Sequence, residues 1–299
     1  KNNLLEAYNT KMMNEDGSYK EATSGYIGGV LDDMEEVISL LKTTEGSADP
    51  RILEVYRKLA LYYADLSMPD SRLVPYGDGG RINVREHFRT AAEITGDRNL
   101  IFFANNFKKD AAPEKMSKVY PCKKLAVLRS GWTNKAMQLF TNAETGGQHG
   151  HPDDLHIDLY AYGYPLLTDP GNGGGYNDKL PAAYVRTETL PYNTVEINGK
   201  SQSLTSGGTN KMELRGNDAF DFLEATTYAN EGFEHTRKIS FIKNAYIAVT
   251  DYITPEDLTA VNTYRQAWHP DNGGNVTVDS SSLTAKTHFA AGANLTVMQ

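Results

Sequence analysis

The sequence has little or none of several features that would each have limited the possible functions of the protein. It has one cysteine, Cys122, among 299 residues, which excludes an intrachain disulfide and a cysteine-based metal site. Its apolar runs all fall short of the roughly 18 residues that cross a bilayer, and its mean hydropathy is −0.51. The sequence therefore predicts no membrane span.

Positive charge is not in excess either. The chain has 30 Lys and Arg against 38 Asp and Glu, a net charge of −8. This balance argues against attraction of the whole surface to nucleic acid or acidic lipid. A local basic cleft for an acidic substrate remains compatible with it, because electrostatic fields focus in clefts whatever the net charge. We expect no nucleic-acid partner.

The two ends of the chain also lack familiar features. The N-terminus has neither an initiator methionine nor the apolar segment of a signal peptide, and residues 293–299 stop inside an alternating apolar run. We therefore expect the sequence to be a piece of a longer protein. With hydrophobic residues at 39%, the piece can bury a core.

Up to about Lys108, apolar residues recur at spacings of three and four. This pattern predicts helices, with Pro69 beyond the end of the third and Gly96 at the end of the fourth. The apolar segments that carry the pattern are 4–12, 30–41, 52–63 and 84–95. Helices joined by short turns favour stacked helical hairpins that belong to a larger array.

From about Val119 the period switches to two, which predicts short strands. Turns rich in Gly and Asn separate them, and the lack of β-α-β alternation disfavours a parallel sheet. The strand segments are 125–128, 137–140, 155–160, 194–197, 239–242 and 246–250. The predicted fold class is α+β, with a helical domain over 1–115 and a large antiparallel β-sandwich over 116–299.

Polar chemistry is concentrated in residues 146–171, which hold three histidines and four aspartates. In an extended chain, His149 and His151 would point the same way, and Asp169 could return beside them on the next strand. Such a group suits Zn²⁺ or a general acid–base pair. A turn whose aspartates cap backbone amides explains the same residues equally well.

Several motifs resemble the heparinase II/III-like polysaccharide lyases, in order along almost the whole chain. The resemblance implies an incomplete (α/α) toroid followed by a β-sandwich, with a sugar-binding cleft between them. The segments that carry it are 16–19 (DGSY), Glu21, 24–26 (SGY), 76–78 (YGD), 128–132 (LRSGW), 147–155 (GQHGHPDDL), 167–171 (LTDPG) and 192–195 (YNTV).

These lyases cleave acidic polysaccharides by β-elimination, which removes the proton at C5 of a uronic acid and expels the oxygen at C4. Carried over by motif, Tyr26 gives or takes a proton. His149 is its partner across the cleft, acting either as base or as a holder of the substrate carboxylate. Gln148 adds a donor to the substrate carboxylate, whose neutralisation makes the carbanion tolerable. The resemblance places the main neutralising Asn or His in an earlier helix, upstream of Lys1. The chain alone is then expected to bind sugar poorly and to turn over slowly or not at all.

The resemblance also implies a structural zinc ion, with His151 and Asp169 as ligands. The family usually has a His before Asn-Thr as a third ligand, where this chain has Tyr192. Phenolate is a rare zinc ligand, so the alternatives are a metal-free site or a substitute ligand, His156 or His269.

Two further residues are candidates for substrate binding. Arg81 begins a series of arginines, with Arg85 and Arg89, that could guide a polyanion, although a solvated helix face explains such a series as well. Trp132 could stack on a sugar ring, or it could serve the core.

Two other function classes remain open beside the lyase. A toroid-fold glycoside hydrolase needs two positioned carboxylates, for which Asp153 and Asp154 are the candidates. A non-catalytic carbohydrate-binding or scaffold protein needs neither. A polymeric substrate implies a periplasmic or secreted protein, whereas the polysaccharide, a glycosaminoglycan or alginate, and the oligomeric state are not set by the sequence.

Overall fold

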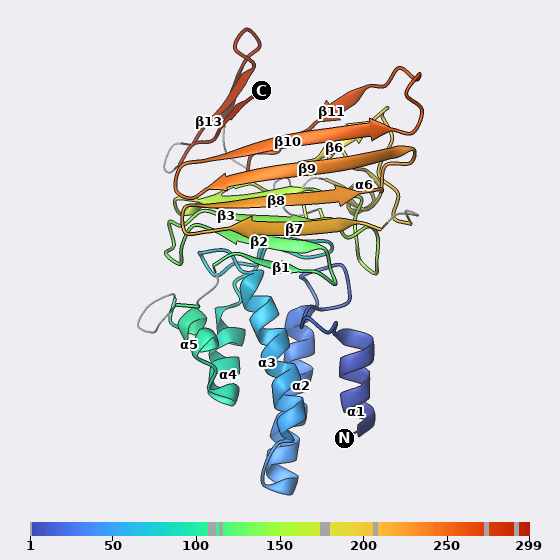
Figure 1. Ribbon diagram of the computed structural model, residues 1–299. Coiled ribbons are helices and arrows are strands. Elements are labelled where there is room, and N and C mark those ends of the chain that lie inside the picture. The colour runs from blue at the N-terminus through green and yellow to red at the C-terminus, as the bar shows by residue number, and fades with distance from the viewer. Residues whose placement is uncertain are drawn as a thin grey trace.

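A computed structural model describes residues 2–106, 112–113, 116–173, 180–205, 209–271, 275–289 and 293–299. The helices of its first part lie below the sheets in Figure 1. The helices are α1 (Asn2–Ala7), the π-helical turn η1 (Tyr8–Met12), α2 (Ile27–Glu45), α3 (Pro50–Asp65), α4 (Arg85–Thr95), α5 (Arg98–Ala104) and α6 (Ala182–Thr187).

The strands form four antiparallel sheets, in the orders β1-β2-β3-β4-β5, β10-β9-β8-β7, β11-β6 and β12-β13-β14. Their bounds are β1 (Lys118–Tyr120), β2 (Leu125–Arg129), β3 (Gln138–Asn142), β4 (Ile157–Ala161), β5 (Tyr164–Leu167), β6 (Val195–Ile197), β7 (Lys211–Gly216), β8 (Phe220–Thr227), β9 (Phe233–Ile242), β10 (Tyr246–Pro255), β11 (Tyr264–Gln266), β12 (Asn275–Asp279), β13 (Thr284–His288) and β14 (Thr296–Met298).

Local signals in the sequence explain where the helices begin and end. Asp49 caps α3 by accepting a hydrogen bond from the Arg51 amide at 2.9 Å, and Pro50 occupies the first helical position. Gly96 ends α4 in the left-handed conformation, as predicted. The helix pairs α2–α3 and α4–α5 are thus joined by short connections, which confirms the expected helical hairpins.

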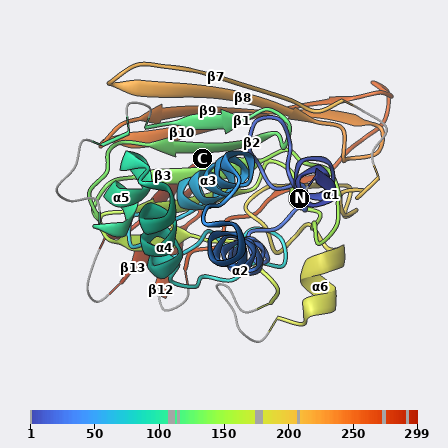
Figure 2. The same cartoon turned by 90° about the horizontal axis from the view of Figure 1, so that it is seen from below.

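The sheet β1–β5 is the middle layer of the molecule, and every residue of β2, β3 and β4 is buried. Side chains along β2 alternate between two hydrophobic clusters. Leu125 and Val127 pack with the helices, whereas Ala126 and Leu128 pack against the second sheet. The helices therefore cover one face of this sheet and strands β7–β10 cover the other (Figure 2), which is the expected β-sandwich.

The hydrophobic core does not stop where the helices end. The cluster around α2–α5 also contains Tyr120, Phe140 and Tyr160 from the middle sheet. The strands β12–β14 stand apart and carry the C-terminus (Figure 1). Within the part of the chain that is described, none of the helices has the length and apolar character that crossing a bilayer requires.

One predicted strand begins later than expected. The alternation in 155–160 predicted a strand from Leu155, but β4 begins at Ile157. Leu155 has φ +65° and the His156 amide donates to the Asp153 carbonyl at 2.9 Å. A turn through Asp153 and Asp154 therefore replaces the first two strand residues, because the aspartates favour a turn over extended chain.

Candidate functional site

Three loops meet at the junction of the helices and the middle sheet, namely residues 16–26, 74–79 and 146–151. The Ala22 amide donates to the Gln148 carbonyl at 2.9 Å, and the Asp78 amide donates to the His149 carbonyl at 3.3 Å. Backbone hydrogen bonds thus join two loops of the helical part to the histidine-rich loop of the sandwich. These bonds bring together residues that are far apart in the sequence.

Gly77 allows this close approach. Its φ is +58°, and a Cβ atom placed on it would lie 2.0 Å from the Ala22 carbonyl oxygen and 2.7 Å from that of His149. Neither backbone atom can move without breaking the contact between the loops. A side chain at this position would therefore separate Asp78 from the histidines.

Tyr26 and His149, the predicted acid–base pair, are brought together. Their ring centroids are 4.5 Å apart, and Tyr26, directly before α2, is 46% exposed. His149 has φ +64°, so the expectation that His149 and His151 lie in extended chain is wrong. The left-handed turn still lets both imidazoles reach one carboxylate, that of Asp78.

Asp78 is the centre of the site. Its Oδ2 lies 3.0 Å from His149 Nδ1 and its Oδ1 lies 3.1 Å from His151 Nε2. The Arg186 guanidinium donates to both oxygens, at 2.9 and 3.0 Å. Burial would raise the pKa of Asp78, but the hydrogen bonds from Arg186, His149 and His151 outweigh burial and hold it below its ordinary value. Asp78 is therefore an ionised carboxylate that accepts hydrogen bonds from two histidines and one arginine.

The contact with Asp78 decides which nitrogen of His149 can act as an acceptor. Because Nδ1 faces a carboxylate, it carries the proton, and Nε2 keeps its lone pair. Around Nε2 lie the Gln148 side-chain nitrogen at 3.4 Å and Glu21 Oε2 at 3.9 Å. Gln148 thus lies beside His149 Nε2, and its contact with the substrate carboxylate stays a prediction.

Arg186 and Asp78 were not among the predicted site residues. Asp78 carried a signal, because it follows Gly77 in a turn that resembles a family loop, but Arg186 had none. Arg186 lies on α6 with half of its side chain exposed, and the proximity of Tyr26 contributes to raising its pKa, after the hydrogen bond and charge of Asp78. The structure therefore adds a cation to a site that otherwise holds no arginine or lysine from the predicted set.

His151 is fully enclosed between two partners. Its Nε2 faces Asp78, and its Nδ1 lies 2.8 Å from the Tyr192 hydroxyl, which is also within hydrogen-bond distance of the Val185 carbonyl. Burial lowers the pKa of His151, and Asp78 offsets only part of that effect. Tyr192 thus contacts His151 directly, at the position where the family usually has a His.

Asp169, the second predicted zinc ligand, faces a different histidine. Its Oδ2 lies 3.7 Å from His156 Nε2, and its Oδ1 accepts from the Gly171 amide. The Asn193 amide donates to His156 Nδ1 at 2.9 Å, so Nε2 carries the proton and has no lone pair for a metal. Among the described residues, no group of three clustered metal-ligating side chains includes His151 or Asp169.

His269, the other candidate substitute, has its Nε2 2.8 Å from the Leu190 carbonyl. A carbonyl accepts only, so this nitrogen also carries the proton. The side chains as placed do not fit a zinc ion held by His151 and Asp169, and no step of the chemistry below depends on one.

Arg81 and Trp132 lie in structural contacts instead of beside His149. The Arg81 guanidinium donates to Asp271 at 2.9 Å and to the Thr168 hydroxyl, and it ties the helical part to the sandwich. The Trp132 ring packs edge-on against Phe102 and Phe103 of α5. The structure offers no contact of either residue with the Tyr26–His149 pair, and their predicted substrate contacts stay untested.

The Asp78 contacts lead to a prediction about positioning. Replacing Asp78 by Asn removes the charge that orients His149 and holds Arg186, and we expect kcat to fall about 10²-fold with a smaller change in KM. Initial rates on an acidic polysaccharide would measure both constants. Asp218→Asn, an exposed aspartate in the β7–β8 turn, is the matched control and should retain full activity. Equal losses in both variants would contradict a positioning role for Asp78.

Comparison with known proteins identifies the family. The model of the heparinase II/III-like C-terminal family matches residues 112–298. The chain belongs to this family. Heparin-sulfate lyase from Bacteroides stercoris is 24% identical over 250 residues, which cover 81% of this chain and 37% of that protein. Heparin-sulfate lyase from Pedobacter heparinus is 23% identical over 257 residues, covering 82% and 38%.

Solved structures of the heparinase II/III-like family show the same fold. The heparan sulfate lyase HepC from Pedobacter heparinus superposes with a TM-score of 0.86 at 20% identity, over 99% of this chain and 47% of that one. A heparinase III structure gives 0.84 at 19% identity, over 99% and 48%. The chain therefore spans less than half the length of these relatives, and it has their combination of helices and antiparallel sheets.

Proposed function

We propose that this chain is part of a polysaccharide lyase that cleaves a uronic-acid-containing glycosaminoglycan of the heparan sulfate type by β-elimination. The observation that carries the proposal is the Tyr26–His149 pair, with ring centroids 4.5 Å apart, at the junction of the helices and the sandwich. Two relatives named heparin-sulfate lyase support the substrate class. We expect a periplasmic or secreted protein, because the polymer is met outside the cytoplasm.

In this proposal His149 is the base. Its Nε2 lone pair accepts the C5 proton, while Asp78 on Nδ1 stabilises the imidazolium that forms. The electrons of the C5–H bond become the C4–C5 double bond, and the C4–O bond breaks. His149 thus has a carboxylate beside Nδ1 and a lone pair on Nε2, which is the arrangement that a general base needs.

Tyr26 then serves as the acid. Its phenol hydroxyl gives a proton to the departing O4 oxygen. Its side chain is half-exposed, which leaves room for a sugar. Asp78 holds Arg186 in the neighbourhood of Tyr26. The exposed half of the Arg186 guanidinium can therefore offset charge that develops on the substrate carboxylate.

The glycoside hydrolase alternative has weaker support. Asp153 and Asp154 are each 1% exposed. Asp154 accepts from Thr145 and Thr227, and Asp153 from Asn142. Carboxylates enclosed in this way cannot reach a glycosidic bond on both sides, which inverting and retaining hydrolysis both require.

The experiment that tests the proposal is ultraviolet absorbance during incubation with heparan sulfate, chondroitin sulfate, hyaluronan and alginate. β-Elimination leaves a conjugated C4–C5 double bond that absorbs, whereas hydrolysis leaves none. We expect absorbance to rise with heparan sulfate for the full-length protein, and to rise more slowly for this chain alone. Release of reducing ends without absorbance would overturn the lyase proposal, and a rise only with alginate would overturn the substrate class.

A further inference from the structure

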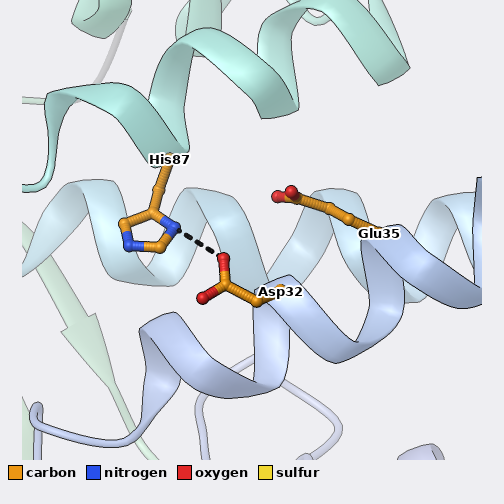
Figure 3. Close-up of side chains that lie close together, drawn as sticks. All are labelled: Asp32, Glu35 and His87. Atoms are coloured by element: carbon orange, nitrogen blue, oxygen red, sulfur yellow. Dashed lines mark ion pairs between the residues drawn. The ribbon is translucent and has the colours of Figure 1, made fainter.

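A second group of polar side chains lies between α2 and α4, away from the histidine-rich loop. Asp32 and Glu35 are three residues apart on α2 and share one face of the helix, and His87 points toward them from α4 (Figure 3). Two carboxylates this close on one helix repel each other unless a cation lies between them. Among the described residues, this is the group of three metal-ligating side chains that comes together.

The distances within the group suit a small divalent ion. His87 Nδ1 lies 3.4 Å from Asp32 Oδ1, and one ligand atom from each of the three residues lies within 4.8 Å of the other two. Ligands about 2.1 Å from a tetrahedral zinc ion are about 3.4 Å apart. The His87–Asp32 pair already has this spacing, and Glu35 offers the third ligand atom from within 4.8 Å of both.

The surroundings of the group supply the outer hydrogen bonds of a metal site. The Tyr56 hydroxyl donates to Glu35 Oε1 at 2.7 Å and orients that carboxylate. The Tyr63 hydroxyl is completely buried and has no hydrogen-bond partner among the described residues. The Tyr63 hydroxyl and His87 Nε2 both border Gly28, since a Cβ atom placed there would lie 3.1 Å from each of them.

This unpartnered hydroxyl points to a ligand. A histidine that binds a metal through Nδ1 carries its proton on Nε2 and needs an acceptor there. The Tyr63 oxygen is a polar atom on that side of His87, and its ring meets the imidazole edge-on at a centroid distance of 5.6 Å. The Tyr63 hydroxyl, which borders Gly28 as His87 Nε2 does, is therefore the buried polar group that a shift of the two rings would offer to the proton fixed on His87.

We propose that Asp32, Glu35 and His87 bind one divalent transition-metal ion, Zn²⁺ or Mn²⁺, which ties α2 to α4. Two carboxylates and one imidazole, with the remaining positions open to water, are a donor set that both ions accept. Asp32 lies about 9 Å along α2 from Tyr26, at 1.5 Å per residue. The ion therefore steadies the helix that begins next to Tyr26 and does not touch substrate.

The test is isothermal titration of the full chain with Zn²⁺, and separately with Mn²⁺, in a Cys122→Ser background that removes the exposed thiol. We expect one ion to bind per chain and the melting temperature to rise. His87→Gln and Asp32→Asn should each weaken binding by about tenfold or more. Glu36→Gln, an exposed carboxylate on the same helix, is the matched control and should bind as the parent does.

Two results would overturn the proposal. One is the absence of binding heat with either ion at millimolar concentration. The other is unchanged affinity in His87→Gln with its circular dichroism intact, which would place the ion elsewhere. Gly28→Ala gives an independent check, because its Cβ would press on His87 and Tyr63. This variant should weaken binding while all three ligands remain.

Discussion

Tyr26→Phe should lower the rate of polysaccharide cleavage by about 10²- to 10⁴-fold, and His149→Ala should lower it by a similar factor. Loss of a positioned general acid or base has this effect. Tyr26→Phe keeps the ring that lies 4.5 Å from His149 and removes only the hydroxyl. The measurement is the initial rate of ultraviolet absorbance with heparan sulfate, in the full-length protein.

The double variant and a matched tyrosine sharpen this prediction. Because the two residues act in one step, the combined loss in Tyr26→Phe/His149→Ala should be much smaller than the product of the single losses. Tyr164→Phe changes another exposed tyrosine, on β5, and should leave the rate unchanged. A Tyr26→Phe rate within about twofold of the parent would contradict the acid role, given the contribution that such groups make.

Arg237→Met should destabilise the protein by about 3–5 kcal/mol, because it leaves the largely buried carboxylate of Asp251 without its guanidinium partner. Arg237 is 1% exposed and holds both oxygens of Asp251, at 2.7 and 2.9 Å. It also donates to the carbonyls of Leu155 and Asn193, at 2.6 and 2.7 Å. One side chain thus joins the outer sheet to the segment just before β4. Urea unfolding followed by circular dichroism measures the change in the free energy of unfolding.

The next residue along β9 provides the control. Lys238 pairs with Glu224 at 2.9 Å, but both side chains are more than a third exposed. Lys238→Met should therefore cost no more than about 1 kcal/mol. Equal losses of unfolding free energy in the two variants would show that the burial of Arg237 does not determine how much it stabilises the protein.

Acid pH gives the Arg237 prediction a second readout. Burial would raise the pKa of Asp251, but the Arg237 charge and the hydrogen bonds from His235 and Arg237 hold it well below its ordinary value. A carboxyl with a depressed folded pKa contributes stability above its unfolded value, near 3.9, and loses that contribution as pH falls. The difference in unfolding free energy between the parent and Arg237→Met should therefore shrink below about pH 4.

Much of the fold follows from local patterns in the sequence. The change from a spacing of three and four to a spacing of two marks the change from helices to strands, and Gly96 ends α4 where the sequence predicts. These patterns can be recognised in the sequence because each helix or strand buries one face, and apolar residues recur with the period of that face. The boundary at residue 115 stays a prediction, and a hydrophobic cluster extends across it.

The site was predictable where a motif carried it. Tyr26, Gln148 and His149 lie together as the resemblance implied, although their roles in catalysis are proposals. Arg81 and Trp132 show the limit of this reasoning. An arginine in a series, or a tryptophan beside a strand, has the same local pattern whether it meets substrate or packs against its own chain, and only the partners reveal which.

What the sequence by itself determined is the order of helices and strands and the presence of a histidine-rich loop, since both depend on neighbours along the chain. Only the tertiary structure decided which charges meet. Asp78 joins His149, His151 and Arg186 from separate loops, and Tyr192 contacts His151 while Asp169 faces His156. Such pairings leave no periodic pattern in the sequence, because each depends on contacts between loops that are distant along the chain. Gly77 makes these contacts possible, because it has no side chain to keep the backbones apart.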